Sequence, residues 1–204
     1  MLPEYDFSHG KRGMHAHRFA QGTRVVIVDD KVEEGSEGNG FQPEQDAEFM
    51  RLAGRNLLVE QLVKGGIDVA IPVVDRRVDF IAYSGARADD GGAFVACPIH
   101  AKIDAGQRFS LDRKDASVPN LIIAYVWNAA NFSKAAVYAL TYAEAFAVLE
   151  KKGHTRTASW EKGFYTIPKA DGILLEMLQQ FRMTPEAWMK RIESASKNKF
   201  LTAL

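Results

Sequence analysis

The segment IDVAIPVVDRRVDFIAY, residues 67–83, holds two apolar runs separated by a short polar stretch. Residues 67–72 and 78–83 are rich in β-branched and aromatic side chains, which are typical of strands. The residues around Asp75 between the two runs are charged, as expected for a turn on the surface. The segment therefore predicts two successive β-strands joined by a turn.

Further elements are predicted on both sides of this segment. Residues 43–62 repeat apolar side chains at steps of three and four, which predicts a helix that Gly65 and Gly66 end. Three more strands are predicted at residues 94–103, 121–127 and 136–140. The run at 121–127 is apolar throughout, as in strands buried on both faces. Pro98 interrupts the run at 94–103 and predicts irregular pairing there.

The last third of the chain has the pattern of helices. Thr141 and Glu144 have the spacing of a capping box at the start of a helix over residues 142–151. Two more helices are predicted at residues 173–182 and 185–192. The polar stretch at residues 109–114 is interpreted as a loop or a short helix.

The order of a helix, five strands and then helices predicts an α/β fold with a central mixed β-sheet flanked by helices. A doubly wound nucleotide-binding fold would alternate strands and helices strictly, and this chain does not. The Gly65–Gly66 pair ends a helix and does not open one. The sequence therefore argues against a dinucleotide site or a phosphate-binding P-loop.

The composition limits the possible partners. The 204 residues contain 26 Lys and Arg and 26 Asp and Glu, for a formal net charge of +0. A surface that binds nucleic acid would therefore have to be a local patch. The single cysteine, Cys97, lies in an apolar run and is expected to be buried. Neither a signal peptide nor a membrane span is recognisable, so we expect a cytoplasmic protein with no membrane partner.

The first forty residues differ from the rest. Residues 7–18 are polar and basic, residues 24–29 are apolar, and residues 30–40 are acidic and rich in glycine. We therefore expect an N-terminal arm and linker at 1–40 and one α/β domain at 41–204. The arm resembles small bacterial antitoxin-like proteins in its YDFS, RG and valine-rich segments. This resemblance implies a role in defence or toxin–antitoxin systems, or an arm that pairs with a homodimer mate or another protein partner.

Three residues of the central strands could carry chemistry. Asp79 lies among apolar strand residues, where a carboxylate is costly to bury without a cation or hydrogen-bond donors. His100 and Lys102 lie on one face of the strand at 94–103, because strand side chains alternate. If the two strands are antiparallel neighbours, the three side chains converge. The structural alternative is an Asp79 that pairs with Lys102 or Arg77 and only holds the sheet together.

This layout, over roughly residues 45–150, resembles the PD-(D/E)XK nuclease-like superfamily. The resemblance implies a restriction-endonuclease-like αβββαβ core and a divalent metal, Mg²⁺ or Mn²⁺, held by Asp79 and His100. Lys102 would then activate or orient the attacking water. His100 stands where the family has Glu or Gln, and Gly54 and Arg55 stand where its first helix often has a Glu. His100 is therefore interpreted as a substitute metal ligand or a base.

The resemblance implies a metal-dependent phosphodiesterase that acts on or binds nucleic acid. The alternative is a catalytically inactive interaction module of the same fold, which could form a homodimer. Arg108, Arg113 and Lys114 are the predicted phosphate contacts. Trp160, interpreted as a loop residue, is the predicted base-stacking side chain, whereas Trp127 is expected in the core.

Overall fold

The computed structural model describes residues 43–197, apart from residues 75, 86–93 and 132. The expectations for the arm at 1–40, its boundary with the domain and its partners lie outside the described residues.

The five strands predicted from the sequence form one mixed sheet with the order β1-β2-β3-β5-β6. These strands are β1 (Asp68–Ala70), β2 (Phe80–Ser84), β3 (Val95–Ile103), β5 (Ile122–Trp127) and β6 (Ala136–Thr141). The pair β3–β5 is parallel, and the other three neighbouring pairs are antiparallel. The predicted α/β fold with a central mixed sheet is therefore confirmed.

Pro98 does not disturb the sheet as predicted. The β2–β3 register runs through the Ile81–Pro98 pair with no residue skipped, so the expectation of irregular pairing there is wrong. The parallel pairing of β3 with β5 begins only at Ile99. Pro98 thus lies where β3 has one described neighbouring strand, which is the edge position that a proline tolerates.

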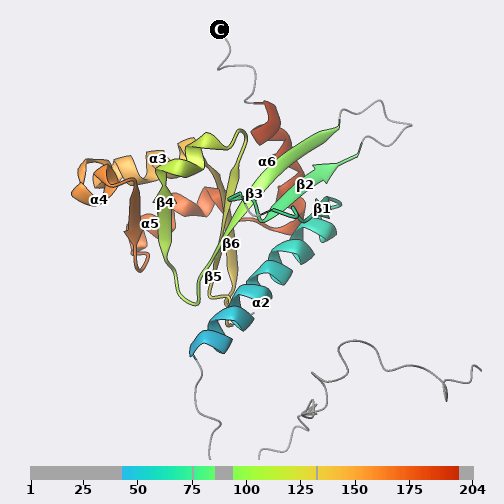
Figure 1. Cartoon of the computed structure of the whole chain (residues 1–204), viewed down its shortest axis with the longest axis horizontal. Helices are drawn as coiled ribbons and strands as arrows, with labels where there is room; N and C mark the ends of the chain where they lie inside the picture. The colour runs from blue at the N-terminus through green and yellow to red at the C-terminus, as the bar shows by residue number, and fades with distance from the viewer. Residues whose placement is uncertain (1–42, 75, 86–93, 132, 198–204) are drawn as a thin grey trace, which may run out of the picture. The chain divides into compact units, whose positions relative to one another are not determined.

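The core lies on both faces of β5, all of whose residues are buried. On one face, Ile122 and Ala124 pack with residues of α2 (Pro43–Lys64) and α6 (Pro185–Lys197). On the other, Ile123 and Tyr125 pack with α3 (Tyr142–Lys151) and α5 (Gly172–Leu178). Figure 1 shows this separation, with α2 and α6 on one side of the sheet and α3, α4 and α5 on the other. The apolar run predicted to be buried on both faces is confirmed.

A second, two-stranded sheet was not predicted from the sequence. It pairs β4 (Phe109–Asp112) antiparallel with β7 (Phe164–Ile167). The interpretation of 109–114 as a loop or short helix is therefore wrong for 109–112, whereas a 3₁₀ helix, η1 (Arg113–Ser117), follows. Within β4, buried Phe109 and Leu111 alternate with partly exposed Ser110 and Asp112. An alternation over only four residues is too short to be recognised as a strand in the sequence.

The helices begin close to the residues predicted from the sequence, but two of them end elsewhere: α5 ends at Leu178 and α6 at Lys197, against predicted ends at residues 182 and 192. The chain leaves α2 through Gly66, whose φ of 75° favours glycine. Two short 3₁₀ helices, η2 (His154–Arg156) and η3 (Gln179–Phe181), and the helical turn α4 (Ala158–Glu161) complete the described elements. No helix in the described part is long and apolar enough to cross a membrane.

The predicted capping box of α3 is present in full. The Thr141 hydroxyl accepts from the backbone N–H of Glu144, and the Glu144 carboxylate accepts from the backbone N–H of Thr141. Arg191 of α6 also donates to this carboxylate, at 3.0 Å. The start of α3 is thereby tied to α6.

We expect Thr141→Ala to lower the free energy of unfolding by about 1 kcal/mol, because the helix loses the acceptor for one of its first N–H groups. Chemical denaturation measures this change. Ser159→Ala is the control, because Ser159 is exposed in α4 and no side-chain hydrogen bond is described for it. Equal stability of the two variants would contradict a stabilising role for the capping box.

Candidate functional site

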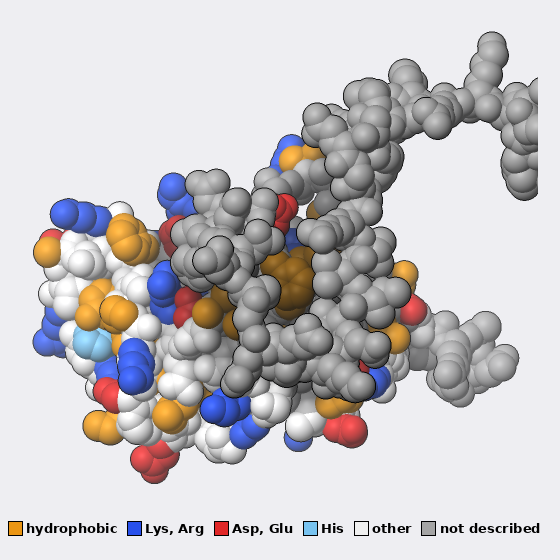
Figure 2. All heavy atoms as spheres, turned by 90° about the horizontal axis from the view of Figure 1, so that it is seen from below, with side chains coloured by type: hydrophobic (Ala, Val, Ile, Leu, Met, Phe, Trp, Pro, Cys, Tyr) orange, Lys and Arg blue, Asp and Glu red, His pale blue; other side chains and the backbone are white. Residues whose placement is uncertain are grey.

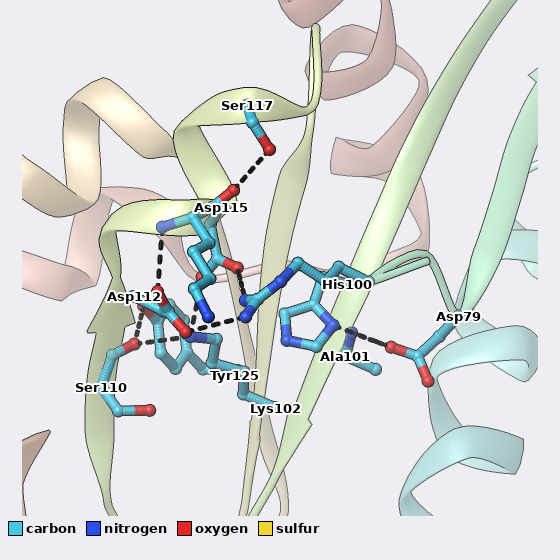
Figure 3. A network of polar contacts seen from close by, with 11 residues as sticks. Asp79, His100, Ala101, Lys102, Ser110, Asp112, Asp115, Ser117 and Tyr125 are labelled. Carbon is cyan, nitrogen blue, oxygen red and sulfur yellow. Dashed lines mark hydrogen bonds and ion pairs between the residues drawn. The ribbon is translucent and has the colours of Figure 1, made fainter. Parts of the chain in front are cut away.

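Asp79 and His100 lie in contact across β2 and β3. Asp79 immediately precedes β2, and its Oδ2 lies 3.1 Å from Nδ1 of His100 on β3. The same oxygen accepts from the backbone N–H of Ala101 at 2.8 Å. The antiparallel pairing of β2 with β3 brings these residues together, as the strand alternation predicted. Figure 3 shows the imidazole turned toward the carboxylate.

The cation on Asp79 is Arg55, which the sequence argument did not select as its partner. Nη1 of Arg55, on α2, donates to Oδ1 of Asp79 at 2.8 Å. The guanidinium also lies over the ring of Phe80, 4.7 Å from its centroid. Gly54 lets the helix come this close, because a Cβ there would lie 2.5 Å from Cγ2 of Ile103 on β3. One feature of the sequence could have indicated this ion pair: Arg55 stands where the nuclease pattern often has a Glu that helps to bind the metal.

Lys102 binds a different carboxylate. Its Nζ donates to Oδ2 of Asp115 at 3.0 Å and to the backbone carbonyl of Ser110 at 3.1 Å. Asp115, in η1, is completely buried and also accepts from Nη1 of Arg77 at 2.9 Å. Nη2 of Arg77 donates to Asp112 at 3.0 Å. The structure thus places Lys102 in a second ion-pair cluster, beside the Asp79–His100 contact (Figure 3).

The ion pairs change the acidity of these carboxyl groups. Burial alone would raise the pKa of Asp79. The hydrogen bonds from His100 and Ala101 and the attraction of His100 and Arg55 outweigh burial, so the pKa of Asp79 lies below its ordinary value. The pKa of Asp112 is also lowered, because bonds from the Lys114 N–H and Arg77 outweigh its burial. Both groups are therefore held as carboxylates at neutral pH.

The arrangement around Asp79 does not fit a hard divalent cation. A magnesium site needs several oxygen ligands, whereas this one offers a single carboxylate and an imidazole. Both oxygens of Asp79 already accept hydrogen bonds, and one of them contacts the permanent positive charge of Arg55. Within the described ranges, no three His, Cys, Asp or Glu residues are grouped closely enough to hold a metal ion.

The predicted nucleic-acid contacts have different surroundings. Arg113 and Lys114 are exposed on η1, next to the second ion-pair cluster. Arg108 is exposed and forms an ion pair with Asp104 at 3.3 Å. On the face seen in Figure 2, Lys and Arg side chains are scattered among acidic and apolar ones, in keeping with the net charge of +0.

The prediction for Trp160 is wrong. Trp160 lies in the helical turn α4, which the Thr157 hydroxyl caps, and not in a loop. Its side chain is only 7% exposed and packs against Phe146, with the ring centroids 5.7 Å apart. The ring therefore offers no free face for base stacking. The predicted burial of Trp127 and Cys97 is confirmed, because both are 0% exposed.

The charges at the two clusters nearly balance. Arg55, Arg77 and Lys102 are neutralised by the three carboxylates that they contact. The exposed Arg113 and Lys114 leave a local surplus of positive charge at η1.

Comparison with known protein families, with curated proteins and with solved structures finds no match for this chain.

Proposed function

We propose that this protein binds nucleic acid on a nuclease-like arrangement of residues, in which Arg55 takes the place of the metal ion. The observation that carries the proposal is the 2.8 Å contact between Nη1 of Arg55 and Oδ1 of Asp79. Arg55 supplies the positive charge that compensates the half-buried carboxylate. The protein would thus keep the charge pattern of the site without the Lewis acid that metal-dependent hydrolysis requires.

The engagement of Lys102 also favours binding over hydrolysis. A lysine that orients or activates water needs an ammonium group free to reach it. Two of the three donors of Lys102 are used by Asp115 and by the carbonyl of Ser110, and its side chain is only 15% exposed. Lys102 therefore contributes positive charge at a fixed position.

Nucleic acid is the partner that the exposed cations next to these clusters favour. Arg113 and Lys114 are exposed, although the Arg113 guanidinium also lies over the ring of Trp160, 6.0 Å from its centroid. Contacts of such cations with phosphates supply most of the affinity in sequence-independent binding. The proposal keeps a restriction-endonuclease-like core, with α2, β1 to β3 and β5 in the corresponding order. It departs from the αβββαβ pattern between β3 and β5, where the chain forms β4 and η1.

The test is the affinity of a fluorescent single-stranded oligonucleotide at several salt concentrations, without divalent metal. We expect the double variant Arg113→Ala, Lys114→Ala to bind more weakly. The negative slope of log affinity against log salt should become shallower by about 1.4, or about 0.7 for each lost phosphate contact.

The matched control is Lys134→Ala, Lys190→Ala, which removes the same charge from exposed positions after β5 and on α6. It should leave the slope unchanged. Equal slopes for the two double variants would show that η1 does not contact phosphates. A wild-type protein that binds no oligonucleotide would overturn the proposal.

A second candidate is the metal-dependent phosphodiesterase that the resemblance implies. The contact between Asp79 and His100 favours it, because the second ring nitrogen of His100 has no partner in the described part and the side chain is 25% exposed. Arg55 would have to leave Asp79 before a cation could bind. Cleavage that requires Mg²⁺ or Mn²⁺ and disappears in Asp79→Ala would establish this candidate in place of the first.

A further inference from the structure

A small polar pocket lies next to Lys102, outside the Asp79–His100 contact. Its volume is about 220 Å³, and its lining includes Lys102, Ser110, Asp112, Phe164 and Thr166. It lies on the two-stranded sheet of β4 and β7. Pockets for drug-sized ligands begin at about 300 Å³, so this one suits a single ring system better than a whole nucleotide.

The strand register places the polar lining on one face of the small sheet. Ser110 pairs with Thr166, and Asp112 pairs with Phe164. Directly paired residues point to the same side of a sheet, and residues two apart share that side. Between them, Leu111 is buried and faces the core. The outer face of β4–β7 is therefore a platform with two hydroxyls, a carboxylate and an aromatic ring.

Phe164 is the unusual residue of this platform. Its side chain is 54% exposed, and no aromatic neighbour is described for it. The next residue, Tyr165, is in contrast stacked on His154 with a ring separation of 4.5 Å. An exposed ring beside a polar pocket is suited to stacking with a flat ligand.

The polar groups of the pocket suit the edge of a nucleobase. No side-chain hydrogen bond is described for the hydroxyls of Ser110 and Thr166, so each can donate and accept. Asp112 provides further acceptor capacity, although its Oδ2 already accepts from Arg77 and its Oδ1 from the backbone N–H of Lys114. Lys102 also lines the pocket, with its ammonium group bound to Asp115 and to the backbone carbonyl of Ser110.

We infer that this pocket receives one unpaired nucleobase of the bound strand, stacked on Phe164 with its edge toward Ser110 and Thr166. The inference rests on the proposed function and specifies it further, since single-stranded nucleic acid presents unpaired bases that can enter such a pocket. Phe164 takes the stacking role that the sequence argument had given to Trp160.

The experiment compares two probes with the same number of phosphates, one with bases and one with abasic sugars. We expect Phe164→Ala to weaken binding of the base-containing probe about fivefold or more, which is the lower range for the loss of one stacked base. Binding of the abasic probe should not change. Phe164→Trp should retain affinity, because it keeps an aromatic face.

Ile173→Ala is the matched control, since Ile173 is an exposed apolar residue at the start of α5 and should not affect either probe. Unfolding midpoints of all variants exclude a loss of fold. If Phe164→Ala affects neither probe, or both equally, the inference is overturned while the proposed function stands. If the wild type binds neither probe, the proposed nucleic-acid binding itself is contradicted.

Discussion

Replacing Arg55 by glutamate is expected to create a divalent-cation site that the wild-type protein lacks. The variant places a third potential ligand next to Asp79 and His100 and removes the guanidinium that lies 2.8 Å from Asp79. Without metal, Arg55→Glu should be less stable than the wild type, because two carboxylates then face each other. With Mn²⁺ at about 100 times the dissociation constant, binding adds about 2.7 kcal/mol of stability. The unfolding midpoint should then rise by about 5 to 11 °C.

Three further proteins make this result specific. The wild type should show no Mn²⁺-dependent shift, and Arg55→Gln should show little, because it removes the cation without adding a carboxylate. The double variant Arg55→Glu, Asp79→Ala should lose the shift again. Calorimetric titration with Mn²⁺ and Mg²⁺ provides an independent measure of binding. A wild type that binds Mn²⁺ as tightly as Arg55→Glu would show that Arg55 does not occupy the place of the metal.

Asp115→Ala is expected to cause the largest loss of stability among the site variants, about 2 to 3 kcal/mol. Asp115 is fully buried and accepts from both Arg77 and Lys102. Its removal leaves two cations without their shared partner. This loss is smaller than the roughly 3 to 5 kcal/mol that breaking a fully buried ion pair costs, because the side chain of Arg77 is 34% exposed and can be hydrated.

The control for this prediction is Glu60→Ala. It breaks an exposed ion pair with Lys64 on α2 and should change stability by less than about 0.5 kcal/mol. Urea denaturation of both variants at neutral pH gives the comparison. Similar small losses in the two variants would mean that the Arg77–Asp115–Lys102 cluster does not hold η1 against the sheet.

The sequence predicted the large elements because their patterns are long or uninterrupted. Examples are the repeat of apolar residues along the helix up to Lys64 and the unbroken apolar run of β5. The capping box at Thr141 is recognisable from the spacing of two residues. The strands β4 and β7 have four residues each, which is too short for an alternation to be recognised. The burial of Trp160 depends on a helical turn that also has only four residues.

For the candidate site, the sequence predicted the contact made by neighbouring strands and missed the contacts made by other elements. Asp79 and His100 meet because β2 and β3 pair, and strand alternation gives the face on which each lies. Arg55 reaches Asp79 only because α2 packs closely on β3 at Gly54. The partner of Lys102 is Asp115, in a polar stretch that no periodicity marks as buried. Such contacts depend on how distant elements pack, and local patterns do not contain that information.

The most direct test of the account is to incubate the wild-type protein with a labelled single-stranded oligonucleotide, in EDTA and in Mn²⁺, and to measure both binding and cleavage. We predict equal affinity in the two conditions and an intact oligonucleotide in both, because Arg55 supplies the charge that a metal would otherwise provide. Cleavage in Mn²⁺ that is lost in Asp79→Ala and in EDTA would contradict the account. It would show that a catalytic metal ion displaces Arg55 from Asp79.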